Sequence, residues 1–269
     1  MSATDAVFAG SIPAIYDRYL GSLLFQPFAE DLASRLSGTM QGRLLETAAG
    51  TGVVTRALVK ALPEQVEIVA TDLNQAMLDL AAGKLEATNV RWQQADAQRL
   101  PFEDSSFDAV VCQFGVMFFP DKLAAYREAL RVLKPGGRFV FNVWNSLDRN
   151  EISLIVAQAA GKAFPEDPPR FIERVPFGYF DPDRIRGEVQ QAGFANVTIE
   201  TVEKASSAPS PRDPAMGLCQ GSPLRAEIEA RAPDRLDEVT DQVSDAIKAR
   251  FGAGPFENRM NALVVTAFR

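Results

Sequence analysis

A turn of small residues between an expected strand and an expected helix is the first place where the sequence offers chemistry. Residues 44–52 read LLETAAGTG, with Glu46 at the end of the strand and Gly50 and Gly52 in the turn. A ligand lying against such a turn approaches the backbone, which a Cβ would prevent, and the helix N-terminus presents free N–H groups to it. A tight turn also needs glycine for structural reasons, so this segment alone leaves both interpretations open.

Two acidic residues at the ends of later strands make a ligand site more specific. Asp72 ends the second expected strand, twenty positions after Gly52, where an acid in a doubly wound sheet accepts hydrogen bonds from ribose hydroxyls. Asp96 follows the third strand, where its carboxylate can accept from an adenine amino group while the N–H of Ala97 donates to the ring. Asp72 could instead be a cap or turn residue, and Asp96 a solvated loop residue. Three such elements on consecutive strands indicate a nucleoside site.

The elements that position these residues alternate between short apolar runs and helical patterns, which is typical of βαβ units in an α/β fold with a parallel sheet. The sequence predicts strands at 43–47, 66–71, 90–94, 107–113, 138–144, 197–202 and 261–269. It predicts helices at 53–62, 75–87, 122–133, 151–164, from 181–182 onward, 223–232 and 234–251. Asn74, Asp121 and Asp181 are the expected N-caps. Residues 205–214 are expected to form a loop, and the two helices after it an insertion before the last strand.

Composition narrows the classes of function. Apolar residues make up 46% and charged residues 23%, as in a soluble globular protein, and the net charge of −7 argues against a nucleic acid partner. The chain has no histidine, which removes Ser-His and Cys-His sites and the commonest metal ligand, so we expect no metal. The start lacks a signal pattern, and the apolar stretch at 110–119 is too short to span a bilayer. Cys112 and Cys219 are expected to be free thiols, which favours a cytoplasmic location.

Five segments resemble the class I methyltransferases that use S-adenosylmethionine, in the branch of the methyltransferase type 11 and ubiquinone- and menaquinone-biosynthesis enzymes. They read LLETAAGTG, VATDLN, ADAQRLPF, FDAVVCQFGVMFF and LRVLKPGGRFVF, in this order within about residues 40–144. The resemblance implies a Rossmann-like, seven-stranded, mainly parallel sheet with its last strand antiparallel and helices on both faces. Ala48 stands where the family has a glycine, and we expect a slightly tighter pocket there.

The resemblance also implies roles, in which S-adenosylmethionine gives its methyl group to a small-molecule acceptor and leaves as S-adenosylhomocysteine. Glu46 would orient the methionine end of the cofactor, Asp72 would hold the ribose, and Gln113 would sit near the sulfonium. The expected cofactor-binding residues are Tyr16, Glu46, Ala48, Gly50, Gly52, Asp72, Leu73, Asp96, Ala97, Gln113 and Phe114. Tyr16 and Tyr19 fall in a segment that resembles a helix covering the cofactor, although packing on the sheet would explain them as well.

We therefore expect a single methyltransferase domain over 1–269. Its expected parts are an N-terminal helical lid at 1–39, a cofactor-binding core at 40–146 and a substrate-side cover at 147–180 and 206–256. An apolar wall at 114–119 and an aromatic group are expected near the acceptor. The aromatic group comprises Phe164, Phe171, Phe177, Tyr179 and Phe180, with Asn142 and Trp144 reaching it.

The catalytic residue is not identified. Without histidine a base would be a carboxylate, tyrosine, lysine or water, which favours an activated carbon, an amine or a thiol as acceptor. Two alternatives stay open: an NAD-dependent oxidoreductase, which would want glycine where Glu46 stands, and an S-adenosylmethionine-binding regulatory protein without turnover. The sequence also leaves open whether the protein is a homodimer.

Overall fold

A seven-stranded sheet organises the computed structural model, which describes residues 10–38 and 40–269. The strands are β1 (Arg43–Glu46), β2 (Glu67–Asp72), β3 (Val90–Gln94), β4 (Phe107–Gln113), β5 (Leu133–Trp144), β6 (Ala195–Ala208) and β7 (Phe256–Phe268). Their order is β3-β2-β1-β4-β5-β7-β6, and β7 pairs antiparallel with both of its neighbours while β1–β5 pair in parallel. The Rossmann-like sheet with an antiparallel last strand, expected from the sequence, is confirmed.

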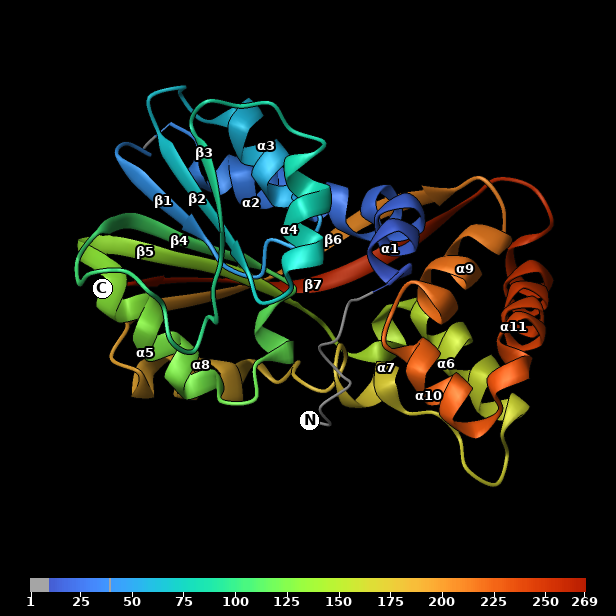
Figure 1. Ribbon diagram of the computed structural model, residues 1–269. Coiled ribbons are helices and arrows are strands. Elements are labelled where there is room, and N and C mark those ends of the chain that lie inside the picture. Colours follow the sequence, from blue (N-terminus) through green and yellow to red (C-terminus); the bar gives the residue numbers. More distant parts are fainter. Residues whose placement is uncertain (1–9, 39) are drawn as a thin grey trace.

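Helices cover both faces of this sheet. Helices α2 (Gln26–Leu36) and α3 (Val53–Ala61) lie on one face, and α5 (Lys122–Val132) and α8 (Pro182–Gln191) on the other (Figure 1). A strand buried from both sides reads as a continuous apolar run, as Leu44–Leu45 and Ala109–Cys112 do at 0% exposure. Helix α4 (Gln75–Ala82) packs on β2 and β3.

A second group of helices gathers beside the sheet, where β6 and β7 extend toward it (Figure 1). These helices are α6 (Glu151–Ala163), α7 (Phe171–Arg174), α9 (Arg212–Gln220), α10 (Leu224–Arg231) and α11 (Leu236–Phe251). Helix α1 (Ile12–Leu20) lies between the two parts, packs on α9, and joins α2 through a π-helical turn, Gly21–Phe25. Helix α1 therefore bridges the sheet and the helical group.

Some element boundaries differ from the sequence-based expectation. The predicted loop at 205–214 is wrong, because Ala205–Ala208 continue β6 and Arg212–Gln220 form α9, so the insertion holds three helices. Pairing decides this: Ala208 pairs with Phe256 of the distant β7, which outweighs the local Ser and Pro composition. Helix α4 ends at Ala82, before Gly83, instead of near residue 87.

Two of the three predicted helix caps are confirmed. Asp121 accepts a hydrogen bond from the backbone N–H of Ala124, and Asp181 accepts from the first turn of α8. Asn74 occupies the N-cap position of α4, but its side chain makes no capping bond and its amide contacts Asp72 instead. That contact places Asn74 in the site described below.

Within the described ranges, no helix is both long and apolar enough to cross a membrane. The same residues hold no group of three or more histidine, cysteine, aspartate or glutamate side chains arranged to bind a metal ion. Cys112 and Cys219 are buried free thiols, as expected.

Candidate functional site

The carboxyl ends of β1–β4 meet at one edge of the sheet, beside a cavity that is partly open to solvent and has about 870 Å³ of empty space, open solvent included. Of the eleven expected cofactor-binding residues, it is lined by Tyr16, Ala48, Gly50, Asp72, Leu73, Asp96, Ala97, Gln113 and Phe114. Glu46 lines a smaller adjoining cavity that shares Gly50 and Gln113. Gly52 lines neither cavity. We call this pair of cavities the edge cavity.

The two glycines of the turn have different structural tasks. Gly50 has a φ of +56°, and a Cβ built on it would meet nothing within 4 Å, so glycine here leaves open space in the edge cavity. Gly52 has a φ of +76° and begins α3, where a Cβ would lie 3.0 Å from the ring of Trp92 and 3.1 Å from Ala81. Gly50 thus serves the cavity, whereas Gly52 serves packing.

Ala48, at the position where the resemblance implies a glycine, is accommodated by another glycine. Ala48 has a φ of +53°, a left-handed conformation that alanine adopts only with strain. A Cβ on Gly115 would overlap the Cβ of Ala48 and lie 2.7 Å from Sγ of Cys112. Gly115 also lines the edge cavity, so the space that Ala48 occupies is given up by Gly115.

The Asp72 carboxylate joins the glycine turn to the end of β2. One oxygen accepts from the backbone N–H of Gly50 at 2.9 Å, and the other accepts from that of Asn74 at 2.8 Å. Asp72 is 7% exposed, and burial raises the pKa of its carboxyl group against the lowering effect of these hydrogen bonds. A carboxylate with two oxygens has further lone pairs to offer a ligand.

A second buried carboxyl group lies at the end of β1. Glu46 is 1% exposed and accepts a hydrogen bond from Oγ1 of Thr55 at 2.7 Å. Burial, with a smaller contribution from the nearby Asp72 carboxylate, raises the pKa of Glu46 to about 8 against the lowering effect of Thr55 and Arg56. Two buried carboxyl groups on neighbouring strands favour a ligand that carries positive charge.

The third acidic residue also lines the edge cavity. Asp96 accepts from the backbone N–H of Gln98 at 2.9 Å, which holds the turn after β3, and Ala97 lines the cavity beside it. Leu73, although apolar and 53% exposed, forms part of the same wall. An exposed leucine that borders a cavity suits the flat face of an aromatic ligand.

The end of β4 supplies a fixed aromatic wall. Phe114 has a φ of +48°, and its N–H donates to both the backbone oxygen and Oδ1 of Asn142, at 3.2 and 2.9 Å. Its ring stacks on Trp144 with centroids 3.8 Å apart. Beside it, Nε2 of Gln113 donates to the carbonyl of Phe25, while the buried Oε1 accepts no hydrogen bond from any described residue. Asn142 therefore fixes the backbone of Phe114 and does not itself line the edge cavity.

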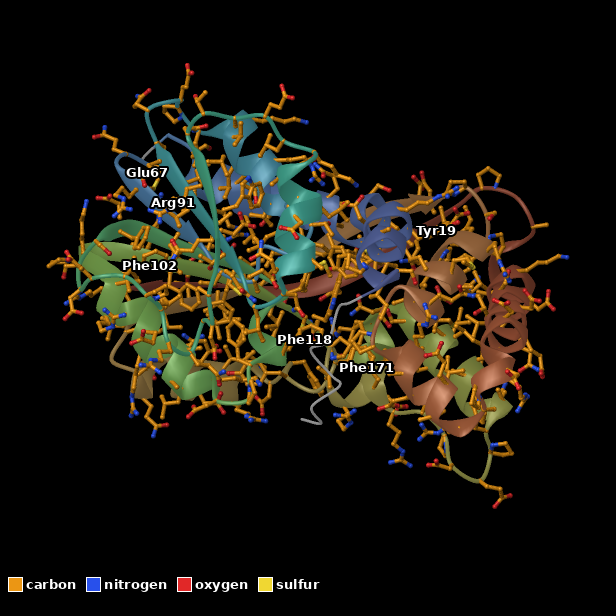
Figure 2. All side chains as sticks on the ribbon, in the orientation of Figure 1. Tyr19, Glu67, Arg91, Phe102, Phe118 and Phe171 are labelled. Atoms are coloured by element: carbon orange, nitrogen blue, oxygen red, sulfur yellow. The ribbon has the colours of Figure 1, made fainter. Side chains whose placement is uncertain are left out.

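A second cavity, of about 600 Å³, adjoins the first and is mostly apolar. Tyr16, Phe114 and Phe118 line both. The other lining residues are Leu20, Leu24, Phe25, Met117, Trp144, Ser153, Phe171, Ile172, Pro176, Phe177, Leu218, Ser222 and Pro223. Among the residues that the structure describes, no aspartate, glutamate, lysine or arginine lines it. Figure 2 shows Phe118 and Phe171 where the sheet meets the helical group. We call this the apolar cavity.

The expected aromatic group is only partly assembled at this place. Phe171 and Phe177 line the apolar cavity with Trp144. Phe164 instead packs under the guanidinium of Arg235, Tyr179 hydrogen-bonds Tyr126 and Glu188, and Phe180 is 42% exposed. Tyr19 lines neither cavity, because its Cβ lies beside Gly217 of α9. The five aromatic residues all lie in the expected cover segment 147–180, so their place in the sequence did not show which of them line the apolar cavity.

Sequence reasoning missed several lining residues. Met77, Ala95 and Gln98 border the edge cavity, and Leu20, Leu24 and Phe25 border the apolar one. Met77 lies in the first turn of α4, shortly after Asp72, and Ala95 directly precedes Asp96. Their closeness to the ends of β2 and β3 could therefore have predicted both as lining residues. The π-helical turn that presents residues 21–25 has no such periodic signature.

Comparison with known proteins identifies the family. A family model described as a methyltransferase domain matches residues 45–141. The chain is 34% identical over 181 residues to a ubiquinone/menaquinone biosynthesis C-methyltransferase of Stutzerimonas stutzeri, covering 62% of this chain and 71% of that enzyme. It is 43% identical over 107 residues to the corresponding enzyme of Idiomarina loihiensis, covering 38% of this chain and 43% of that enzyme. The chain belongs to the class I S-adenosylmethionine-dependent methyltransferases.

A solved structure shares the fold. Phosphoethanolamine N-methyltransferase 2 of Haemonchus contortus, in complex with phosphomonomethylethanolamine and S-adenosylhomocysteine, superimposes with a TM-score of 0.61 at 16% identity, covering 96% of this chain and 57% of that one. The relatives do not favour an oxidoreductase or a binding protein without turnover.

S-adenosylmethionine is the cofactor of this methyltransferase, and the edge cavity fits it. This ligand would use three features of the cavity: the open space over Gly50, the buried carboxylate of Asp72 and the buried Oε1 of Gln113. That oxygen accepts no hydrogen bond from any described residue.

The pKa of Glu46 predicts how the stability of the methyltransferase depends on pH. Because this pKa rises from 4.5 to about 8 on folding, the folded state binds more protons between these values, so stability falls as pH rises through that window. The raised pKa of Asp72 acts in the same direction. Thermal unfolding should show that the melting temperature falls as pH rises through this window. Glu46→Gln should make this fall less steep, whereas Glu64→Gln, at an exposed position, should leave it unchanged. If the melting temperature of Glu46→Gln fell with pH as steeply as that of the unsubstituted protein, the raised pKa of Glu46 would be contradicted.

The pairing of Ala48 with Gly115 predicts a coupled pair of substitutions. Gly115→Ala should destabilise the methyltransferase by about 1–3 kcal/mol, because the new methyl group overlaps that of Ala48. Ala48→Gly in the same protein should recover part of this loss, since the overlap with Ala48 disappears while that with Cys112 remains. Urea unfolding of both single variants and the double variant measures the coupling. Strictly additive free energies would show that the two residues do not compete for space.

Proposed function

We propose that this protein transfers the methyl group of S-adenosylmethionine to a carbon atom of a small, uncharged, largely apolar acceptor bound in the apolar cavity. The observation that carries the proposal is the shared wall of Tyr16, Phe114 and Phe118, which brings the two cavities into contact. The names of the relatives in Stutzerimonas and Idiomarina specify C-methylation for those enzymes, which supports carbon as the accepting atom here.

In this proposal the strand ends hold the cofactor. Asp72 accepts from the ribose hydroxyls, and Asp96 with the N–H of Ala97 binds the adenine. Glu46, once ionised, faces the ammonium group of the methionine end. The buried position of Glu46 and Asp72 supports these roles, because charge pairing is strong where water is excluded.

The bound cofactor supplies the electrophilic methyl group. The remaining task of the protein is to align the acceptor and exclude water. Phe114 suits that task, because Asn142 fixes its backbone with two acceptors and Trp144 stacks on its ring. A rigid aromatic wall between two cavities limits the approach of an acceptor to a narrow range of directions.

The groups around the apolar cavity favour an acceptor that does not need a protein base. Its polar side chains are the hydroxyls of Tyr16, Ser153 and Ser222 and the indole of Trp144. Burial and the neighbouring Asp72 carboxylate raise the pKa of the Tyr16 phenol above its usual value, so this hydroxyl stays protonated at neutral pH. An electron-rich ring carbon needs no deprotonation before it attacks, and the ring proton that the methyl group replaces leaves afterwards to a water molecule. We therefore prefer carbon to an alcohol oxygen as the accepting atom.

Several sequence-based expectations stay proposals. Helix α1 would serve as the lid of the 1–39 segment, whose residues 1–9 and 39 lie outside the described residues. Segments 147–180 and 206–256 would form the cover, and they contribute Ser153, Phe177 and Leu218 to the apolar cavity. A cytoplasmic location, the lack of a nucleic acid partner and a homodimer likewise remain predictions.

The proposed acceptor class predicts the outcome of a substrate screen with radiolabelled cofactor. Hydroquinones and naphthols should be methylated on carbon, as shown by mass spectrometry of the products, whereas phosphoethanolamine and glycine should not. Ser153→Asp should raise the KM for such an acceptor by at least about tenfold, because it buries a charge in the apolar cavity. Its matched control, Ser153→Ala, should leave the KM within about twofold, since a single buried hydroxyl contributes little.

Two results would contradict this acceptor assignment. One is turnover of the charged amines without turnover of the neutral rings. The other is a KM for the neutral ring that Ser153→Asp does not change while S-adenosylhomocysteine still binds.

A further inference from the structure

Helix α1 lies unusually close to α9 because glycines stand at their contact. A Cβ built on Gly217 would overlap the Leu20 side chain, lying 2.8 Å from its Cγ, and would lie 3.1 Å from the Cβ of Tyr19. A Cβ on Gly221 would lie 2.9 Å from the backbone nitrogen of Tyr16. Residues four apart fall on one helical face. Gly217 and Gly221 therefore form a flat seat for α1, and we call them the α9 seat.

Polar contacts hold α1 from two sides. Asp17 pairs with Lys84, just beyond α4, and lies 4.0 Å from the guanidinium of Arg56 in α3. On the side of the helical group, Arg225 of α10 donates to the hydroxyl of Ser11 at 3.0 Å. The helix is thus fixed both to the cofactor-binding part of the sheet and to the helical insertion.

The position of α1 matters because one helix closes two cavities. Tyr16 lines the edge cavity and the apolar cavity, and Leu20 lines the apolar one. Helix α9 contributes Leu218 to the apolar cavity but, among the described residues, none to the edge cavity. Helix α1 therefore offers a direct route from α9 to the edge cavity, because it packs on α9 and carries Tyr16.

We propose that Gly217 and Gly221 are positioning residues that seat α1 as the common lid of both cavities, so that α9 controls how fast the cofactor product leaves. Displacing α1 from the α9 seat shifts Tyr16, which lines both cavities. The inference rests on the cofactor and on the lid role of α1 in the proposed function, and it does not depend on which acceptor binds.

The experiment compares Gly217→Ala with Gly187→Ala in the full-length protein. Gly217→Ala should speed the dissociation of S-adenosylhomocysteine about tenfold, within the range that one extra methyl group in a packed contact produces. Hydrogen exchange should increase in residues 12–20 and stay unchanged in β1 and β4. Gly187→Ala, on the exposed side of α8 where a Cβ would meet nothing within 4 Å, should change neither quantity. Stopped-flow displacement and exchange mass spectrometry supply the two readouts.

A second site keeps the test valid if Gly217→Ala fails to fold. Asp17→Asn weakens the ion pairs on the opposite side of α1 and should also speed release and loosen residues 12–20. Adding Leu20→Ala to Gly217→Ala removes the overlapping Cγ and should slow release again.

Unchanged release and unchanged exchange in both single variants would overturn the proposal. Exchange that rises in β1 and β4 as much as in residues 12–20 would also overturn it, because it would indicate a general loss of stability. A failed acceptor screen would contradict the proposed acceptor while leaving these release measurements as they are.

Discussion

Two carboxyl groups buried at the ends of neighbouring parallel strands are the constraint on which the site depends. Glu46 ends β1 and Asp72 ends β2, and both are almost fully buried. Burial disfavours the charged forms of both groups and raises both pKa values, and the Asp72 carboxylate adds to the rise at Glu46. The backbone N–H of Gly50 and the hydroxyl of Thr55 offset part of this cost. In the proposed function, the positively charged groups of S-adenosylmethionine would offset the rest of this cost.

The second constraint is that the same side chains form walls of both cavities. Phe114 and Phe118 separate the edge cavity from the apolar cavity, and Tyr16 of α1 covers both. The sheet provides the rigid side, through the two hydrogen bonds between Asn142 and Phe114. The helical group provides the other side, by packing on α1. A methyl transfer that must exclude water gains from such an arrangement, because one closure shields both reactants.

The cofactor half of this arrangement could be predicted from the sequence, because it is written in local patterns. Strands β3 and β4 begin and end at the predicted residues, since each is a short run bounded by turns. Asp72 and Asp96 were found because parallel strands bring their carboxyl ends to the same edge. The spacing of glycines did not distinguish Gly50, which opens the cavity, from Gly52, which serves packing against Trp92.

The acceptor half could not be predicted, because it is assembled from contacts that are distant in sequence. The end of β6 and the first residues of α9 fall in the segment 205–214 that the sequence predicts as a loop, since the pairing of β6 with β7 joins residues far apart along the chain. The apolar cavity draws on α1, the π-helical turn, β5, α7 and α9, and no periodic pattern links these segments. Likewise, the fit of Ala48 against Gly115 is visible only once both are placed.

The most direct test of the account is a calorimetric titration of the protein and of Asp72→Ala with S-adenosylhomocysteine, with NAD as the control ligand. We predict saturable binding of S-adenosylhomocysteine and no binding of NAD. In folded Asp72→Ala the ribose hydroxyls of S-adenosylhomocysteine lose their acceptor, so the binding free energy should weaken by about 1–3 kcal/mol. Binding of NAD, or an unchanged affinity in folded Asp72→Ala, would contradict the assignment of the edge cavity as the cofactor site.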